Sequence, residues 1–458
     1  MLVPLLASVL GAVPPPRAPD NANLIIHAPR LDQLAGVLAF FEAAGKRAPL
    51  LRPSSWRSEF HPILDVDIGR AESIKRAGID PASWATLSFL GEDRITCTAL
   101  RDAKAFESRA TQQLASLGKA WTSQSEGLVL HGAAANGRVV AGYAIRRQQA
   151  CAVSSTRNAE ALLKQAAKLL ATAPDSRRWS SLESIPGRVY LISPHFTIGL
   201  TGSSATLSVA GRAAAISSPR FKPTAASPYP ESGASGLLFV RAHMESAPRA
   251  LLESSVVPDL RTLCSGCDER DVHQLFDAAL ASLTGNVLLR VDGARLSGSL
   301  KSPWEKYFAV KHAYLAEIGR PDGFRQALDR AAAWPNARKT AEGIALSLQG
   351  GEIQIGLRGS QLYFGNDPGV VKRALQTVSG QIGKLNHGAE FSIDAPKISR
   401  TLSQVSLLDA LGSRDLAPLL VVSSEVGPLL DASRAVKGWV DTASDGSQRF
   451  ALTWTLLP

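Results

Sequence analysis

The chain has 458 residues, of which 45% are hydrophobic and 20% are charged. This composition can build hydrophobic cores, so it excludes an intrinsically disordered protein. The length is typical of two or three domains, and the net charge of +10 makes the chain basic.

The first residues have the pattern of an export signal. An apolar run from Leu2 to Val13 is followed by Pro14 to Pro16, the order typical of a secretory signal peptide and an extended mature start. No Lys or Arg precedes the run, and a buried N-terminal helix or strand is the alternative. The run is too short to cross a bilayer, and no later segment approaches about 20 apolar residues. We predict a periplasmic or secreted protein, with residues 1–21 as this segment.

The first half of the chain alternates strand and helix signals. Asp102 is placed to cap a helix whose apolar stripe includes Phe106 and Leu114, Asn158 is placed to cap another, and Asn136-Gly137 suits a tight hairpin. We expect helices over 31–45, 102–118 and 158–170, and strands over 23–28, 94–100, 126–132, 137–145, 150–155, 189–200 and 205–211.

The second half repeats this order. Asp367-Pro368 is placed to open a helix, and Asp445-Gly446 suits a hairpin. We expect helices over 271–283, 322–334 and 370–378, and strands over 236–242, 286–293, 312–318, 342–348, 352–357, 361–365, 437–442 and 449–456.

The repeated order of signals indicates an internal duplication. Residues 213–236, rich in Pro, Ser, Ala and Gly without periodicity, have the composition of a linker. The sequence therefore predicts an α+β fold with two homologous domains, residues 22–212 and 237–458. Each is expected to be a mainly antiparallel sheet with helices packed on one face.

Three stretches carry a resemblance to other proteins. They are GIDPASWATLSFLGEDRITCTAL (residues 78–100), SSTRNAEALL (154–163) and FGNDPGVVKRAL (364–375). With the duplication and the signal-like start, they make the chain similar to duplicated exported bacterial proteins of unknown function. The resemblance implies a non-catalytic envelope protein and supplies no functional residue.

The densest chemical motif places Cys264 and Cys267 two residues apart, with His273 further along an expected helix. A structural zinc site needs four ligands, and this stretch offers at most three with no second pair nearby. A redox pair would follow a buried strand and open a helix, whereas VVPDLRTL is a poor central strand. The interpretation we favour is a local disulfide that clips a turn, with zinc binding and redox catalysis as alternatives.

Cys97 and Cys151 each fall in an expected strand of the first half. In an oxidising compartment an even set of four cysteines favours disulfides. Neighbouring strands of one sheet would bring these two sulfurs within bonding reach. Two separately buried thiols are the alternative, and neither interpretation is catalytic.

Catalytic motifs are absent from the sequence. The sole SxxK, Ser116 to Lys119, lies at an expected helix end beside Gly118. There is no GxSxG, HExxH or Walker loop, and the eight histidines are scattered without metal-ligand spacing. The sequence predicts no cofactor and no metal, and it favours a non-catalytic protein over an enzyme.

The positive charge is concentrated in one region. Residues 101–250 hold 18 Lys and Arg against 8 Asp and Glu, and the rest of the chain holds 32 against 32. The densest points are Arg146-Arg147 and Arg177-Arg178, which are candidate contacts to an anionic surface. Solvated faces are the alternative. A nucleic-acid partner is disfavoured, because stacking aromatics and recognised motifs are missing.

These observations predict an exported non-catalytic envelope or binding protein. Its partner would be an anionic envelope component, or a small apolar ligand in the groove between the two copies. The alternatives are an exported hydrolase or thiol oxidoreductase with a site assembled from distant residues, and a polyanion-binding protein.

Overall fold

A computed structural model describes eleven stretches of the chain, which divides into two compact units, residues 1–213 (unit 1) and 214–458 (unit 2). The described residues are 14–47, 63–64, 66–174, 176–214, 220–231, 236–245, 269–295, 303–348, 350–378, 383–404 and 427–458. Among them, no helix is both long and apolar enough to span a membrane.

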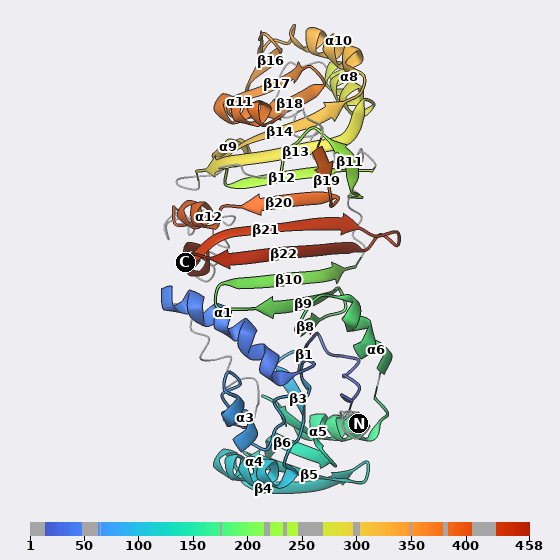
Figure 1. Ribbon diagram of the computed structural model, residues 1–458, viewed down its shortest axis with the longest axis vertical. Helices are drawn as coiled ribbons and strands as arrows, with labels where there is room; N and C mark the ends of the chain where they lie inside the picture. Colours follow the sequence, from blue (N-terminus) through green and yellow to red (C-terminus); the bar gives the residue numbers. More distant parts are fainter. Residues whose placement is uncertain are drawn as a thin grey trace, which may run out of the picture. The chain divides into compact units, whose positions relative to one another are not determined.

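Unit 1 is built around one antiparallel sheet (Figure 1). Its helices are α1 (Leu34–Arg47), α3 (Ala71–Arg76), α4 (Ala103–Leu117), α5 (Glu160–Ala171) and α6 (Ser176–Ser180), with 3-10 turns η1 (Leu31–Gln33) and η2 (Ser181–Ser184). Its strands are β1 (Leu24–Ala28), β2 (Ala85–Leu90), β3 (Asp93–Ala99), β4 (Lys119–Ser125), β5 (Leu128–Ala135), β6 (Arg138–Arg146), β7 (Gln149–Ser154), β8 (Val189–Ile192), β9 (Phe196–Gly202) and β10 (Thr206–Ala213).

Unit 2 has the same kind of architecture. Its helices are α8 (Glu269–Leu280), α9 (Pro303–Ala309), α10 (Pro321–Ala331), α11 (Pro368–Thr377), α12 (Ala395–Leu402) and α15 (Gly427–Asp431). Its strands are β11 (Thr224–Ser227), β12 (Leu238–His243), β13 (Leu283–Ala294), β14 (Val310–Ile318), β15 (Ala337–Lys339), β16 (Gly343–Leu348), β17 (Gly351–Arg358), β18 (Gln361–Gly365), β19 (Gly383–Leu385), β20 (Ala389–Ile393), β21 (Ser433–Thr442) and β22 (Gln448–Leu456).

The two units have the same strand order. The pairings within unit 1 run β4-β5-β6-β7-β3-β2-β1-β8-β9-β10. Those within unit 2 run β15-β16-β17-β18-β14-β13-β12-β20-β21-β22, and β11 and β19 form a small ladder of their own. Every one of these pairs is antiparallel, so the fold is α+β with mainly antiparallel sheets.

The expectation that helices pack on one face of each sheet is wrong. On β6, the Tyr143 ring meets Phe106 of α4, whereas a side chain at the adjacent Gly142 would meet Leu163 of α5. Successive residues of a strand point to opposite faces, so α4 and α5 cover opposite faces of the sheet. In unit 2, Tyr363 packs with α11 and its neighbour Phe364 packs with the α10 cluster.

The predicted linker contains ordered structure. Within residues 220–231, β11 pairs with β19, and Tyr229 is buried in a core cluster of unit 2. The Phe221 backbone exchanges hydrogen bonds with Thr442, and the Ala226 carbonyl accepts one from Asn286. Satisfied backbone groups and one buried aromatic residue fix this stretch despite its linker composition. Of the predicted linker, residues 215–219 and 232–235 lie outside the described residues.

Several local predictions are confirmed. Asp102 accepts hydrogen bonds from the backbone of Lys104 and Ala105 at the start of α4, and Asp367 accepts one from Val370 at the start of α11. Asn136-Gly137 forms the turn between β5 and β6, with φ of 51° and 75°. The sequence reasoning missed β4, because KAWTSQS alternates weakly and is mostly polar. The turn dipeptide Glu126-Gly127, with φ of 52° and 71°, is the signal that could have revealed it.

Candidate functional site

A disulfide joins Cys97 of β3 to Cys151 of β7, with a sulfur–sulfur distance of 2.04 Å. The two residues are directly opposite each other in the ladder, and their side chains are almost fully buried in the cluster that includes α5. A thiol partner cannot reach these buried sulfur atoms without local opening of the fold. The disulfide therefore acts as a structural cross-link of the sheet and does not form a redox centre.

The second cysteine pair, Cys264 and Cys267, lies outside the described residues, so its proposed disulfide stays a prediction. His273 lies in the first turns of α8, where it is half-buried. Among the residues that the structure describes, no group of three or more His, Cys, Asp or Glu side chains is arranged to hold a metal ion.

The four arginines singled out in the sequence occupy different environments. The Arg146 guanidinium donates a hydrogen bond to the Leu170 carbonyl in the last turn of α5, so it satisfies a helix end. Arg147 is exposed at the tip of the β6–β7 turn, with a φ of 54°. Arg178 of α6 lies 6.0 Å from the Trp179 ring centre. Arg177 also lies in α6, and its side chain is outside the described residues. The structure thus leaves Arg147 as the exposed candidate for an external anion.

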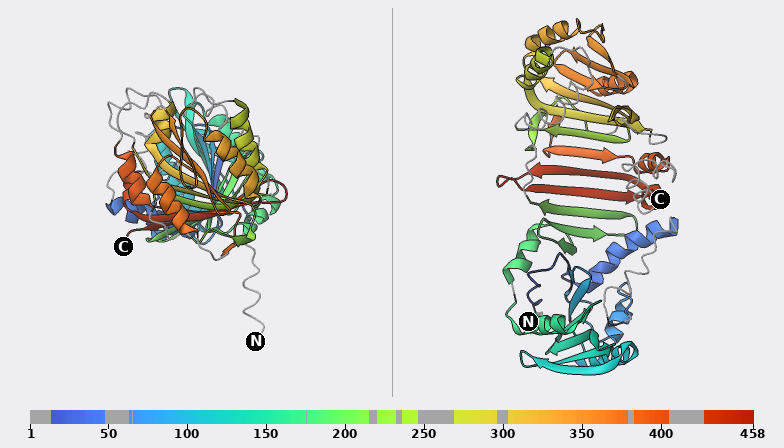
Figure 2. Two further views of the ribbon diagram at one scale, coloured as in Figure 1. Left: turned by 90° about the horizontal axis from the view of Figure 1, so that it is seen from above. Right: turned by 180° about the vertical axis from the view of Figure 1, so that it is seen from behind.

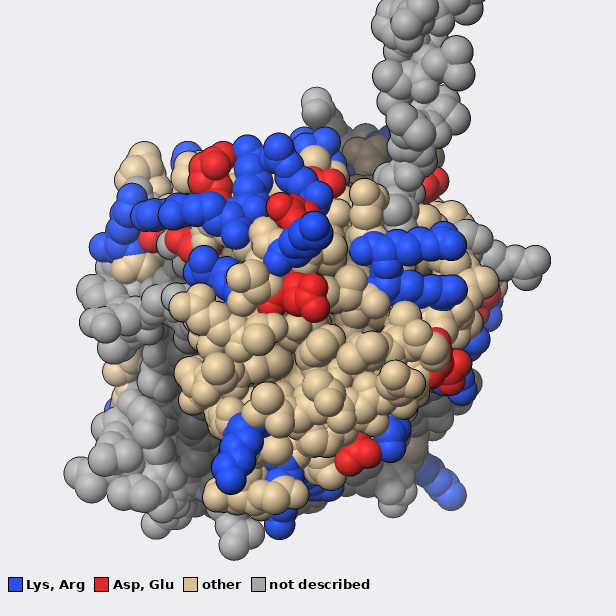
Figure 3. Space-filling model, turned by 90° about the horizontal axis from the view of Figure 1, so that it is seen from below, with Lys and Arg blue, Asp and Glu red and all other residues tan. Residues whose placement is uncertain are grey.

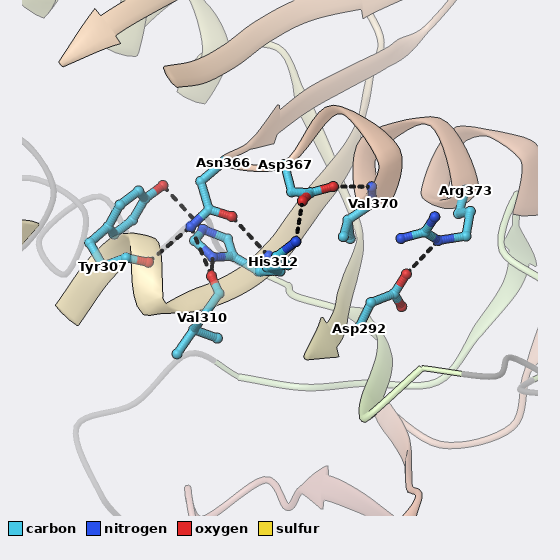
Figure 4. Close-up of polar contacts among 9 residues, drawn as sticks. Asp292, Tyr307, Val310, His312, Asn366, Asp367, Val370 and Arg373 are labelled. Carbon is cyan, nitrogen blue, oxygen red and sulfur yellow. Dashed lines mark hydrogen bonds and ion pairs between the residues drawn. The ribbon is translucent and has the colours of Figure 1, made fainter. Parts of the chain in front are cut away.

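A polar network at the start of α11 holds two backbone segments together (Figure 4). The Asn366 side chain accepts a hydrogen bond from the His312 backbone at 2.9 Å and donates to the carbonyls of Tyr307 and Val310 at 2.9 and 2.8 Å. Lys311 forms an ion pair with the capping residue Asp367 at 3.1 Å.

Both ring nitrogens of His312 also make contacts within the protein. One ring nitrogen of His312 contacts the Val310 carbonyl at 2.8 Å and the other contacts the Tyr307 hydroxyl at 3.1 Å. Burial lowers the pKa of His312, so the ring is neutral at pH 7. The side-chain polar atoms of Asn366 and His312 form hydrogen bonds within this network. The network therefore fixes the junction between α9 and β14.

A buried ion pair crosses the sheet of unit 2. The Arg241 side chain of β12 is 2% exposed and donates to the Glu390 carboxylate of β20 at 2.6 and 3.0 Å. It also donates to the Tyr229 carbonyl at 3.0 Å, and the Tyr229 hydroxyl donates to Gln361 at 2.7 Å. Burial raises the pKa of Tyr229, so the phenol stays protonated. This network links β12, β18 and β20 to the segment that contains Tyr229.

The equivalent position in unit 1 holds a histidine. Two strand segments occupy the same place in the two strand orders, Leu24–Ala28 and Leu238–Ala242. When these segments are aligned, His27 corresponds to Arg241, and Tyr190 corresponds to Glu390. His27 is 3% exposed and stacks on Trp179 with a ring-centre distance of 4.3 Å. A single polar residue in each apolar strand, LIIHA and LFVRA, was the sequence signal for both.

These positions belong to matching rows across the two sheets. The row in unit 1 runs through Tyr190, His27, Thr86, Cys97, Cys151 and Ala144. The row in unit 2 runs through Glu390, Arg241, Leu288, Leu315, Tyr363 and Gly356. The disulfide of unit 1 thus takes the place of a contact between two core residues of unit 2, Leu315 and Tyr363.

A histidine–carboxylate pair lies near the C-terminal end of β21. His387 Nδ1 contacts the Asp441 carboxylate at 2.9 Å, and the imidazole stacks on Trp439 at 3.9 Å. A hydrolase would need a nucleophile beside the second ring nitrogen. In the described stretches, no serine or threonine hydroxyl hydrogen-bonds to His387.

The fold and these contacts define the class of protein: an α+β protein of two antiparallel units, in which the networks around Asn366 and Arg241 are formed by the protein's own groups. No protein-family model matches the sequence, and no curated protein matches it. Crystal form I of TP0453 aligns over 81% of this chain and 99% of that chain, with 10% identity and a TM-score of 0.23. Crystal form IV aligns over 78% and 93%, with 8% identity and a TM-score of 0.20. Similarity at this level carries no argument about function.

Proposed function

We propose that the protein is an exported, non-catalytic envelope or binding component made of two homologous units. The observation that carries this proposal is the buried disulfide between Cys97 and Cys151. Disulfides of this kind persist in oxidising compartments, and cytosolic thiols are kept reduced. The hydrogen bonds that the Asn366 and Arg241 networks make within the protein support a binding or structural role over catalysis. The resemblance to duplicated exported bacterial proteins remains an expectation.

Descent of both units from one ancestral unit is part of this proposal. The support is the identical strand order, together with the matching register in which His27 corresponds to Arg241. Ten strands share one order, and helices follow the first, third and seventh of these strands in both units. Two independent origins would rarely produce this arrangement.

The test is direct analysis of the protein from its native host. Cell fractionation should recover it outside the cytoplasm, with a new N-terminus near Val13. Non-reducing peptide mapping should find the peptides of Cys97 and Cys151 linked. Cytoplasmic recovery with four free thiols would refute export.

We propose anionic-surface binding as the second candidate function. Unit 1 holds 24 Lys and Arg against 16 Asp and Glu, whereas unit 2 holds 26 against 24. Figure 3 shows Lys and Arg side chains gathered along one side of the face it presents. Arg147 is exposed in a left-handed backbone conformation that favours Gly or Asn, and such strained positions are frequent at functional sites.

This candidate is tested with vesicles of acidic lipids. Binding should weaken steeply above roughly 0.1 M salt, where the Debye length is about 10 Å. Arg147→Glu should weaken it. Arg434→Glu, which reverses one exposed charge of unit 2, should preserve it. Arg146 is left unchanged, because its hydrogen bond to Leu170 supports the fold. Equal loss in the two variants would show that the charge forms only a solvated face.

A further inference from the structure

Strand β4 forms an outer edge of the unit 1 sheet. Its seven residues pair with β5 without a bulge, from Lys119 opposite Ala134 to Ser125 opposite Leu128. In the described part of the chain, β5 is the one strand that pairs with β4, so the other side of β4 has no strand partner. Figure 1 and the right-hand view of Figure 2 both show the β4–β5 hairpin at the end of the unit. Ala120, Thr122 and Gln124 are exposed, so backbone donors and acceptors along this edge face solvent.

The equivalent edge of unit 2 is protected. Strand β15 has three residues, and two of them are Arg338 and Lys339. A short edge strand that carries charge is a common way to prevent pairing with another chain. Strand β4 is more than twice as long and contains a single charged residue, Lys119. Two units of one topology therefore differ in whether their outer edge is blocked.

Apolar side chains flank the open edge. Leu117, at the end of α4, is 44% exposed, and Val129, opposite Gln124 on β5, is 47% exposed. They are two of the four large apolar residues that are most exposed in the described part of the chain. Figure 3 views the molecule from this end, and a broad area of the surface carries neither basic nor acidic side chains. The backbone groups of the strand edge and two exposed apolar side chains are thus available together.

We infer that β4 pairs with β4 of a second copy of this chain, in the antiparallel direction. The register that pairs all seven residues centres on Thr122, which then faces Thr122 of the second copy. It sets Lys119 against Ser125, Ala120 against Gln124 and Trp121 against Ser123. In this register, Lys119 does not lie opposite Lys119 of the second copy. A Thr–Thr pair at the centre is favourable in antiparallel ladders. The strand is therefore complementary to itself.

The charge of unit 1 gives this dimer a distinctive salt dependence. Each copy brings an excess of eight positive charges, so the copies repel each other at low ionic strength. Salt screens that repulsion, and dimerisation should strengthen as salt rises. Binding to an anionic surface would change in the opposite direction, so the two proposals fail independently.

The test is sedimentation of the full chain over a range of concentrations. The wild-type mass should double as concentration rises. Thr122→Lys and Thr122→Glu should each raise the dissociation constant by about fivefold, because like charges then face each other. A 1:1 mixture of the two variants should restore the dimer. Ser347→Lys, at an exposed strand position of unit 2, should leave the dimer unchanged.

Ser125 supplies an independent pair of variants. In the proposed register, Ser125→Glu faces Lys119 of the second copy and should strengthen the dimer, whereas Ser125→Lys should weaken it. Thermal melting of each variant checks that the fold is retained. A wild-type chain that stays monomeric at all salt concentrations, as it would if the edge bound another protein, overturns the inference. Dimers that ignore the charges at Thr122 and Ser125 also overturn it.

Discussion

Two buried polar residues, His27 and Arg241, occupy equivalent positions in the two strand orders. The free-energy cost of burying a polar side chain is reduced in a different way at each position. Arg241 donates hydrogen bonds to the Glu390 carboxylate and to the Tyr229 carbonyl. His27 loses its charge, because burial lowers its pKa to about 4. Its Nδ1 atom has no hydrogen-bond partner among the described residues. The two positions therefore respond differently to mutation and to pH.

At Glu390, replacement by alanine would remove the nearest carboxylate of the buried Arg241 guanidinium and leave only the exposed Glu231 carboxylate, at 3.8 Å. We expect Glu390→Ala to lower the free energy of unfolding by about 3 to 5 kcal/mol, measured by urea denaturation. The matched control is Glu342→Ala, which breaks the exposed pair with Arg358 and should cost about 1 kcal/mol or less. Similar losses in the two variants would mean that the Arg241 pair is not buried in solution.

At His27, acid should destabilise the folded state. The unfolded histidine has a pKa of 6.5 and the folded one about 4, so between these values the unfolded state binds more protons. Stability from this residue is complete above about pH 6.5 and decreases toward pH 4, by about 3 kcal/mol in all. His27→Phe, which retains a ring to stack on Trp179, should remove this part of the pH dependence of the urea midpoint. Identical pH profiles for the variant and the wild type would contradict the assignment.

At the scale of elements, the β3–β7 ladder carries the one disulfide in the described part of the chain. The cross-link closes a separation of 54 residues, and a native disulfide of this kind stabilises by about 2 to 4 kcal/mol. We expect Cys97→Ala with Cys151→Ala to lower the melting temperature while the fold is kept. Thiol labelling after mild reductant should modify Cys97 only when urea is present, because both sulfurs are buried. Labelling without urea would show that the ladder opens readily.

The β6–β7 turn carries backbone strain at Arg147. Its φ of 54° is a conformation that Asn or Gly adopts with little cost. Arg147→Asn should therefore raise the free energy of unfolding by about 0.5 to 1 kcal/mol. The control is Gln148→Asn at the neighbouring exposed position, which lacks a positive φ and should give no gain. An unchanged or lower stability in Arg147→Asn would refute strain at this turn.

The elements that the sequence predicted well are those with strong local signals. The caps at Asp102 and Asp367 and the turn at Asn136-Gly137 depend on residues next to one another in the chain. Strand β4 was missed because an outer strand needs no apolar alternation. The placement of α4 and α5 on opposite faces, and the pairing of Arg241 with Glu390, depend on residues far apart in sequence. The packing of the stretch around Tyr229 also could not be read from its linker composition, because it comes from tertiary contacts.

At the scale of the whole molecule, the division after residue 213 predicts two folding units. Residues 14–213 and 214–458, expressed separately, should each unfold cooperatively in circular dichroism. A fragment that begins at residue 237 should be less stable than one that begins at 214, because it lacks the Tyr229 carbonyl that accepts from Arg241. Equal stability of these two fragments would show that residues 220–231 do not contribute to unit 2.

The central strands of both sheets join residues that are synthesised far apart in time. Ile25 of β1 faces Ile192 of β8, and Leu238 of β12 faces Ile393 of β20. At ribosomal rates of about 5 to 20 residues per second, β1 waits roughly 10 to 30 seconds for its second neighbour. Contacts of such long range also slow folding itself. Each nascent unit thus presents an apolar strand with one unpaired edge for many seconds. During this period a chaperone that holds the chain would favour folding over aggregation.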